Sequence, residues 1–325
     1  MKAILCKKFG LPSTLVYEDI ADPKPETDEV LIQVKACSVN FPDSLIIQGL
    51  YQFKPQLPFS PGADIAGVVI AIGKDVKRYK IGDEVVGLTT HGGYAEKAVI
   101  KANACFPKPP GMNHTNAAAF LMAYGTSYYA LKVRANLQPG DTLLVLGASG
   151  GVGLTAVELG KLMGANVIAA ASTQEKLDLC KSYGADELIN YEKEDLKARV
   201  KELTGKKGVN VVLDPVGDKY TDPALRSIAW EGRYLVVGFA AGSIPKVPLN
   251  LALLKSCQIV GVFWGAFAQK YPKQNLALIQ ELVMWFAQKK INPCIQKTFS
   301  LADAPQALEA IMARKAQGKM VIVME

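Results

Sequence analysis

The sequence predicts an α/β protein in which a doubly wound parallel sheet is joined to a second, mostly β domain. From residue 142 onward, short apolar runs alternate with helical segments, which is the pattern of a doubly wound parallel sheet. Residues 1–122 instead contain short strands punctuated by Gly and Pro, with almost no helical periodicity. The length of 325 residues suits two domains of about 100 to 200 residues each.

The first domain is predicted to be a distorted β-barrel. Residues 30–39 alternate partly between apolar and polar side chains, residues 66–72 are apolar, and residues 82–86 follow a turn. In the second domain we expect six parallel strands separated by helices. These strands are residues 142–146, 166–171, 187–190, 209–213, 233–239 and 257–263.

Changes in the pattern give the domain boundaries. An alanine-rich helical stretch begins at Asn116, and a long amphipathic helix pattern follows Trp264. The tail that includes this helix is too short for a third domain, so we expect it to complete the first one. Residues 1–122 and 265–325 are therefore predicted to form one domain, and residues 123–264 the other.

The strand at residues 142–146 runs into a glycine-rich turn and then a helical pattern, an order that favours a dinucleotide site over a turn without a ligand. Three glycines allow a sharp reversal, a close ligand and a close approach of helix to strand. The free N–H groups that begin the helix would face a pyrophosphate. The residues expected to hold it are Gly147, Ser149, Gly150, Gly151, Val152 and Gly153.

Composition and charge limit the remaining classes. The net charge of +7 is spread along the chain without a block of five like charges, which weakly favours anionic small ligands and argues against a nucleic-acid-binding tail. The six cysteines are far apart and form no C-x-x-C pair, as expected of reduced cytosolic thiols. The N-terminal apolar run is too short for a signal peptide, and residues 256–268 are too short to span a bilayer. We expect a soluble, cytoplasmic protein with no membrane partner.

Seven motifs in order along the whole chain resemble the zinc-free branch of the medium-chain dehydrogenase/reductase superfamily, closest to the zeta-crystallin-like quinone oxidoreductases. The resemblance implies a GroES-like barrel domain, a Rossmann domain and a homodimer or homotetramer. The motifs are residues 38–43 (SVNFPD), 49–51 (GLY), 61–67 (PGADIAG), 82–85 (GDEV), 123–127 (AYGTS), 147–153 (GASGGVG) and 318–322 (GKMVI).

The residues themselves argue against a metal site. Catalytic zinc needs three converging Cys, His or carboxylate ligands, and structural zinc needs four closely spaced cysteines. The chain has two histidines and no clustered cysteines. The resemblance adds that zinc-dependent relatives carry Cys and His ligands at the positions of Asn40 and Ala63. No metal is expected.

The end of the second parallel strand indicates which nicotinamide cofactor is bound. An acidic residue there would hold the ribose of NAD, but residues 170–174 are small, hydroxylated or amide side chains. Ser172 leaves room for a 2'-phosphate and Lys176 would neutralise it, so NADPH is favoured. The alternative is that Ser172 and Glu175 form a capping box and Lys176 is a solvated helix lysine. The resemblance implies Lys176 and Tyr191 as 2'-phosphate and adenosine contacts.

Two residues are the candidates for acceptor chemistry. Asn40 would hydrogen-bond an acceptor oxygen or the nicotinamide ribose, and Tyr51 would polarise or protonate a carbonyl oxygen. Alternatively, Asn40 caps a turn before Pro42 and Tyr51 only packs at a domain edge. Both catalytic roles agree with the resemblance.

Further cofactor contacts are expected where predicted strands end, because ligands lie at the carboxyl ends of such strands. The backbone of these ends is expected to meet the nicotinamide carboxamide, although Phe263 and Trp264 fit a domain-interface core equally well. The resemblance implies Thr126 near the nicotinamide ribose and Lys319 as a cofactor contact; a solvated lysine is the alternative for Lys319. The residues at the strand ends are Phe239, Phe263, Trp264 and Gly265.

These features together predict an NADPH-dependent, zinc-free reductase of quinones or other α,β-unsaturated carbonyls that acts by hydride transfer. Leu45 stands where several quinone reductases have an aromatic residue, which weakens the expectation of quinone specificity. One alternative is an enoyl-thioester reductase. Another is a cofactor-binding protein with a structural or nucleic-acid-binding role, for which a basic stretch interleaved with aromatic residues is missing.

Overall fold

The computed structural model describes residues 1–324 as two compact units. The first unit contains Met1–Met122 together with the residues from Pro293 onward, and the second unit is Ala123–Asn292. The second predicted boundary, at residue 265, is therefore too early. Helices α9 (Trp264–Lys270) and α10 (Pro272–Ala287) belong to the second unit. Helix α10 packs on α9, and its Glu281 accepts hydrogen bonds from Tyr128 and Lys132 of that unit.

The first unit is mostly β, as predicted. Its main sheet has the order β14-β15-β3-β4-β5-β7, and β6 also pairs with β3. Strands β1 (Lys2–Leu5) and β2 (Val16–Asp19) form a separate antiparallel pair. The strands of the main sheet are β3 (Glu29–Val39), β4 (Asp64–Ile72), β5 (Glu84–Leu88), β6 (Lys97–Lys101), β7 (Cys105–Pro107), β14 (Ile295–Ser300) and β15 (Lys319–Val323).

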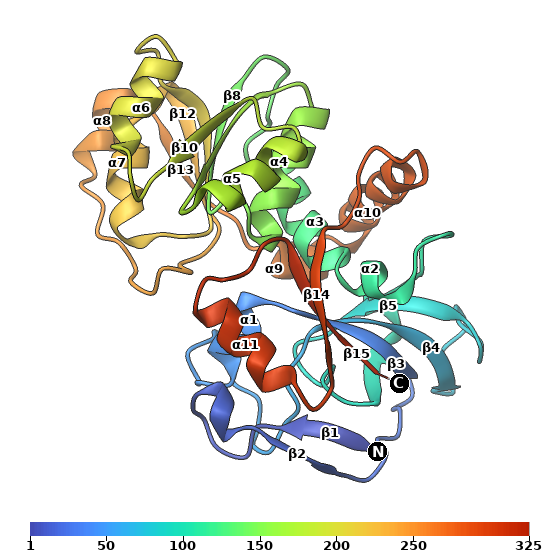
Figure 1. The fold of residues 1–325 in the computed structure, drawn as a ribbon. Coiled ribbons are helices and arrows are strands. Elements are labelled where there is room, and N and C mark those ends of the chain that lie inside the picture. The colour runs from blue at the N-terminus through green and yellow to red at the C-terminus, as the bar shows by residue number, and fades with distance from the viewer. Residues whose placement is uncertain (325) are drawn as a thin grey trace. The chain divides into compact units, whose positions relative to one another are not determined.

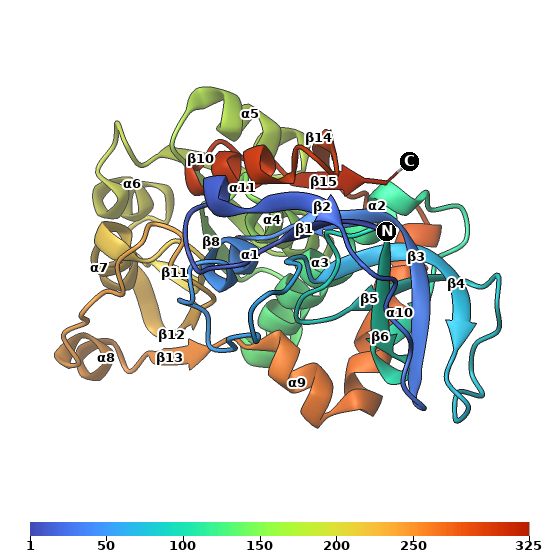
Figure 2. The ribbon, with the colours of Figure 1, turned by 90° about the horizontal axis from the view of Figure 1, so that it is seen from below.

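The C-terminal segment from Pro293 onward completes this sheet, so only this last part of the predicted tail returns to the first unit. Strand β15 pairs antiparallel with β3 (Figures 1 and 2). In the register of this pair, Met320 lies opposite Val39. This register brings Lys319 next to Asn40, at the end of β3. Helices α1 (Phe41–Ile46), α2 (His114–Ala118) and α11 (Ala304–Met312) flank the sheet, and α1 contacts α11.

The second unit contains the predicted doubly wound sheet. Its six strands are parallel and have the order β10-β9-β8-β11-β12-β13, so the first strand along the chain is central. The residues of β8 are almost completely buried, which explains their continuous apolar sequence. The strands are β8 (Thr142–Leu146), β9 (Asn166–Ala171), β10 (Glu187–Asn190), β11 (Val209–Asp214), β12 (Ile228–Val236) and β13 (Gln258–Gly261).

Helices connect these strands and pack on the sheet (Figure 1). The stretch predicted as one helix from Asn116 is divided into α2, α3 (Leu121–Tyr128) and a π-helix, η3 (Tyr129–Arg134). The other helices are α4 (Gly151–Leu162), α5 (Gln174–Ser182), α6 (Leu196–Leu203), α7 (Thr221–Arg226) and α8 (Asn250–Lys255).

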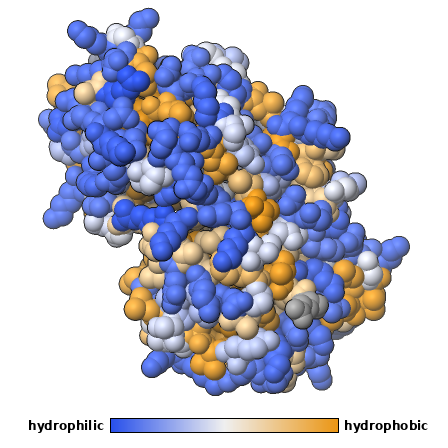
Figure 3. Space-filling view, viewed as in Figure 1, coloured by the Kyte–Doolittle hydropathy of each residue, from blue (hydrophilic) through white to orange (hydrophobic). Residues whose placement is uncertain are grey.

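The surface drawn in Figure 3 is mainly hydrophilic, with separate hydrophobic patches. Within residues 1–324, no helix combines the length and the apolar character that crossing a bilayer requires. All six cysteines are free thiols, and five of them are buried.

Candidate functional site

The glycine turn after β8 has the geometry of a phosphate cradle. Gly147 has a φ of 56°, which favours glycine. A Cβ on Gly153 would lie 2.3 Å from the Gly147 carbonyl oxygen, so only glycine lets α4 start this close to the strand. Gly150 is the N-cap of α4 with extended backbone, and an added Cβ there would meet nothing closer than 3.4 Å. The space above Gly150 is thus open while the space at Gly153 is filled.

This turn fits the pyrophosphate of a dinucleotide. The first N–H groups of a helix have no partner within the helix, and the helix dipole favours negative charge at that end. Gly150 leaves the backbone accessible there, and Ser149 beside it is buried. The predicted residues 147–153 are therefore brought together as one N-terminal cradle of α4.

The carboxyl ends of neighbouring strands place the other predicted nucleotide contacts along the same edge. Because β8, β9 and β10 are parallel neighbours, Gly147, Ser172 and Tyr191 each follow a strand at that edge. The Tyr191 ring lies against the ring of Tyr220, with 4.4 Å between centroids. The fold thus gathers these three predicted residues without any contribution from the first unit.

Lys176 and Ser172 contact each other at the start of α5. Lys176 Nζ donates to Ser172 Oγ at 3.1 Å, and both side chains are half-buried. The predicted capping box of Ser172 and Glu175 is wrong, because the N-cap is Thr173, whose Oγ1 accepts from the backbone N–H of Lys176. The Ser172 hydroxyl therefore contacts Lys176 instead of capping α5. Together the two side chains provide a positive charge and a hydroxyl group at the carboxyl end of β9.

Thr126 lies on α3 and is half-buried. Its neighbour Ser127 joins α3 to the glycine turn: the Ser127 Oγ donates to the Val152 carbonyl oxygen and contacts Thr155 Oγ1, both at 2.8 Å. Sequence reasoning missed the role of Ser127, although it belongs to the AYGTS motif. Its two contacts hold this part of α3 against the start of α4.

The predicted contacts at the last two strands have different environments. Phe239 follows β12 and is half-buried, whereas Phe263 follows β13 and is 54% exposed. Trp264 is buried: its Nε1 donates to Asn275 Oδ1 at 2.9 Å, and its ring fills the space beside Gly125. The indole therefore packs α9 against α3 and α10 inside the second unit, so the contacts shown make Trp264 a core residue of that unit. Only the backbone of Trp264 and Gly265 remains for a cofactor.

In the first unit, Asn40 and Lys319 form a buried contact. Asn40 is the N-cap of α1, as the structural alternative expected, and its backbone N–H donates to Asp43 Oδ2 at 2.8 Å. Its side-chain Oδ1 accepts from Lys319 Nζ. Lys319 is 5% exposed, so the alternative of a solvated lysine is wrong.

Two buried carboxyl groups accompany this lysine. Burial raises the pKa of Asp43 to about 6, although the Asn40 N–H, the Tyr94 hydroxyl and the Lys319 ammonium act in the opposite direction. Burial likewise raises the pKa of Asp64, against the attraction of Lys319. Burial lowers the pKa of Lys319, with both carboxylates opposing. A cation and two acids thus share one water-poor place.

Tyr51 is half-buried and packs against the core of the first unit. Burial first, and the negative charge of Asp43 second, raise the pKa of its hydroxyl. The phenol therefore keeps its proton at neutral pH, as a proton donor to a carbonyl oxygen requires.

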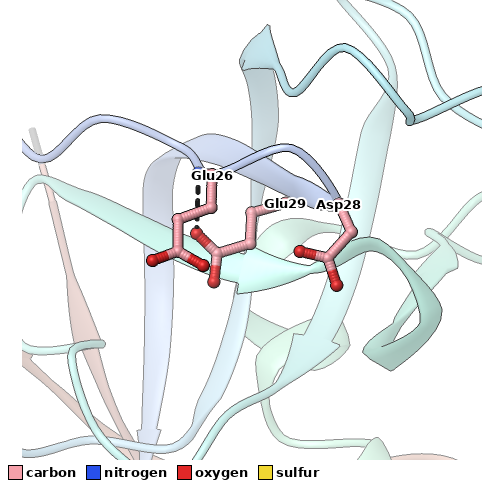
Figure 4. A group of neighbouring side chains, drawn as sticks. All are labelled: Glu26, Asp28 and Glu29. Atoms are coloured by element: carbon pink, nitrogen blue, oxygen red, sulfur yellow. Dashed lines mark hydrogen bonds between the residues drawn. The ribbon is translucent and has the colours of Figure 1, made fainter.

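Glu26, Asp28 and Glu29 form a separate acidic group that brings its oxygens within 4.8 Å of one another (Figure 4). Lys101 Nζ already pairs with all three, at 3.5, 2.9 and 3.1 Å. Glu29 begins β3 and Asn40 follows its end, so this group lies about 35 Å from Asn40 along the 11-residue strand. It is an ion-paired surface cluster apart from the site.

Sequence reasoning missed Asp43 and Asp64 as well as the burial of Lys319. Asp43 stands at the third position after Asn40, where an N-capped helix often carries an acid, and this spacing was the available signal. Asp64 begins an otherwise apolar strand, and this position was a weaker signal.

Comparisons with known proteins agree with this description. Residues 26–110 match the alcohol dehydrogenase GroES-like domain, and residues 151–281 match a model described as zinc-binding dehydrogenase. The quinone oxidoreductase-like protein 2 homolog of Nematostella vectensis is 40% identical over 325 residues, which is 99% of this chain and 88% of that protein.

Two solved structures with NADPH are similar over the whole chain. Escherichia coli quinone oxidoreductase complexed with NADPH is 30% identical with a TM-score of 0.93, covering 99% of this chain and 100% of that one. A mycobacterial protein complexed with NADPH is 31% identical with a TM-score of 0.94 and the same coverage. By its sequence, its fold and these relatives, the chain belongs to the quinone oxidoreductase family of the medium-chain dehydrogenases/reductases, as the seven motifs predicted.

Proposed function

We propose that this protein is a zinc-independent, NADPH-dependent reductase of quinones or other α,β-unsaturated carbonyls. The observation that supports NADPH most strongly is the Lys176–Ser172 contact at the strand edge that also carries the glycine turn. A 2'-phosphate needs a cation and hydroxyl donors, and the residues after β9 supply both without an acid in the position that would hold the ribose of NAD.

The roles of the residues follow from their chemistry. Bound NADPH supplies a hydride. The N-terminal turn of α4 holds the pyrophosphate, while Ser172, Lys176 and Tyr191 hold the adenosine end. In the first unit, the Asn40 amide donates a hydrogen bond to the carbonyl oxygen of the acceptor, and the protonated Tyr51 hydroxyl polarises or protonates it.

Relatives named quinone oxidoreductase support this class of acceptor. The experiment is NADPH oxidation across ortho-quinones, para-quinones, simple enones and enoyl thioesters. We expect quinones or enones to raise the rate clearly above background. A response to enoyl thioesters alone would assign the alternative reductase, and no response to any acceptor would refute the enzymatic role.

Cofactor preference is tested by Lys176→Glu. The new carboxylate would repel the 2'-phosphate, so the Kd for NADPH should rise at least tenfold while the Kd for NADH changes less than threefold. Lys207→Glu is the matched control: Lys207 is exposed and precedes β11, so it lies at the amino ends of the strands of the same sheet. Equal losses for both nucleotides in Lys176→Glu would contradict the assignment, and both Kd values should be measured by fluorescence titration.

We also propose a cytoplasmic location and a homodimer or homotetramer. Six free thiols support a reducing compartment. Exposed apolar side chains at the β13 edge of the second unit support self-association.

A further inference from the structure

Lys319 contacts Asn40 because the sheet places them together. Strand β15 pairs antiparallel with β3, and Met320 opposite Val39 puts Lys319 beside the N-cap of α1. Its Nζ donates to Asn40 Oδ1 and, at 3.3 Å, to the Val39 carbonyl oxygen. The contact therefore belongs to the core of the sheet, and a flexible surface lysine would not maintain it.

The chemistry of the two groups fixes the orientation of the amide. An ammonium carries three N–H donors and no acceptor, whereas an amide has one oxygen acceptor and one NH2 group. Lys319 can therefore engage Oδ1 and nothing else on Asn40. The NH2 group must then point away from Lys319: it faces the Asp64 carboxylate and makes one long contact, at 3.4 Å, with the Ser38 carbonyl oxygen.

We infer that Lys319 is a positioning residue for the carbonyl acceptor: it locks the Asn40 amide in the orientation that donates an N–H to the acceptor oxygen. Without the lysine, the amide loses the donor that holds Oδ1, and an amide that turned over would present this oxygen, which repels a carbonyl oxygen. This inference rests on the proposed function, because it requires an acceptor at Asn40. It changes the predicted role of Lys319 from a contact of the cofactor to a support of the acceptor site.

Asp64 is the counter-ion that keeps such a lysine in the interior. Its carboxylate is completely buried, and the groups that favour its charged form are the Lys319 ammonium, the Met122 backbone N–H and the Asn40 amide. A completely buried carboxylate is retained only where an opposite charge compensates it, and the Lys319 ammonium supplies that charge. Removing the lysine alone therefore leaves an uncompensated acid, so its variant must be tested together with neutralisation of Asp64.

The test compares Lys319→Met with the double variant Lys319→Met/Asp64→Asn. Three quantities are measured: the Tm of each protein without ligand, the Kd for NADPH, and kcat/KM for the best acceptor at saturating NADPH. We expect Lys319→Met to unfold at lower temperature and the double variant to regain most of the lost Tm. In both, the Kd for NADPH should stay within threefold of wild type, while kcat/KM for the acceptor falls at least tenfold.

A double-mutant cycle then asks whether Lys319 acts through Asn40. In an Asn40→Ala background, adding Lys319→Met/Asp64→Asn should change kcat/KM less than threefold, since there is no amide left to orient. Lys319→Arg, which also presents only donors, should retain more activity than Lys319→Met.

Several results would overturn the inference. A tenfold rise in the Kd for NADPH with unchanged acceptor kcat/KM would make Lys319 a cofactor contact. Recovery of turnover together with Tm in the double variant would make it a purely structural residue. Full, additive losses in the Asn40→Ala background would show that it acts elsewhere. If none of the acceptors supports NADPH oxidation by wild type itself, the proposed function fails as well. That outcome is distinguishable from the other three, which are seen only in the variants.

Discussion

Glu158 is a half-buried residue of α4 whose carboxylate holds two distant segments of the second unit. It accepts from the Tyr124 hydroxyl at 2.6 Å and from the Asn292 backbone N–H at 3.0 Å. These partners stand near the two points where the chain passes between the units, at residues 122–123 and 292–293. Burial is the main reason that the pKa of Glu158 rises to about 7, while both hydrogen bonds lower it.

This shift predicts how stability changes with pH. The folded-state pKa, about 7, is above the ordinary value of 4.5, so the folded state holds the proton more tightly and this group's contribution to stability falls as pH rises from about 4.5 to about 7. Glu158→Gln removes the ionisation, and we expect it to be more stable than wild type by about 1–3 kcal/mol at pH 8, but not at pH 5. Urea unfolding at both pH values measures this.

The control is Glu309→Gln, at an exposed position of α11, which removes one carboxylate that is already open to solvent. A stability difference between Glu158→Gln and wild type that is the same at pH 5 and pH 8 would show that Glu158 does not ionise in this range.

At the scale of elements, the glycine turn contains one glycine that folding requires and another that ligand binding would require. Gly153 has no room for a Cβ because the turn and α4 are in contact there, whereas Gly150 has room but faces the proposed pyrophosphate. Both glycines are part of one motif, yet the structure assigns them different reasons for lacking a side chain.

Two alanine substitutions test this difference. Gly153→Ala should destabilise the protein by about 1–3 kcal/mol, because α4 must move away from the turn. Gly150→Ala should cost less than about 1 kcal/mol of stability but raise the Kd for NADPH at least tenfold, since its methyl group would occupy the ligand's space. Thermal unfolding and NADPH titration of the two variants provide the comparison. Unchanged NADPH affinity in Gly150→Ala would contradict the cradle.

The elements also show what the sequence can and cannot predict. Strands such as β8 are buried on both faces, so their unbroken apolar runs predicted the sheet directly. The cap of α5 was misplaced by one residue because Ser172 and Thr173 are both good caps, and only the hydrogen bond from the Lys176 backbone N–H to Thr173 Oγ1 separates them. The burial of Lys319 was beyond prediction, because its partner Asn40 is 279 residues away.

At the scale of the whole molecule, the second unit leaves one sheet edge with exposed apolar side chains. Strand β13 ends the sheet, and the segment before it is rich in exposed leucine and isoleucine. An apolar sheet edge is a site for pairing with another chain, and large apolar patches mark interfaces. The side chains of this β13 edge surface are Ile244, Leu249, Leu253, Leu254 and Ile259, between 42% and 80% exposed.

We expect the β13 edge surface to carry the proposed homodimer. Light scattering should give a mass above the 35.0 kDa of one chain for wild type. Ile259→Lys with Leu253→Lys should shift the protein to the monomer mass, because two buried lysines at an interface cost more than the contact gains. Ile81→Lys, at a 66% exposed position of the first unit, is the control and should leave the mass unchanged. A monomeric wild type would refute this assignment.

The central claim, that the chain reduces a conjugated carbonyl with hydride from NADPH, is tested most directly by isotope transfer. Wild-type protein is incubated with an enone and NADPH deuterated at C4 on one face or the other, and the product is examined by mass spectrometry and NMR. We predict one deuterium on the product carbon that receives the hydride, from one of the two cofactor stereoisomers. With ordinary NADPH in deuterated water, we predict no deuterium at that carbon. Deuterium from the solvent at that carbon, or NADPH oxidation without labelled product, would contradict the account.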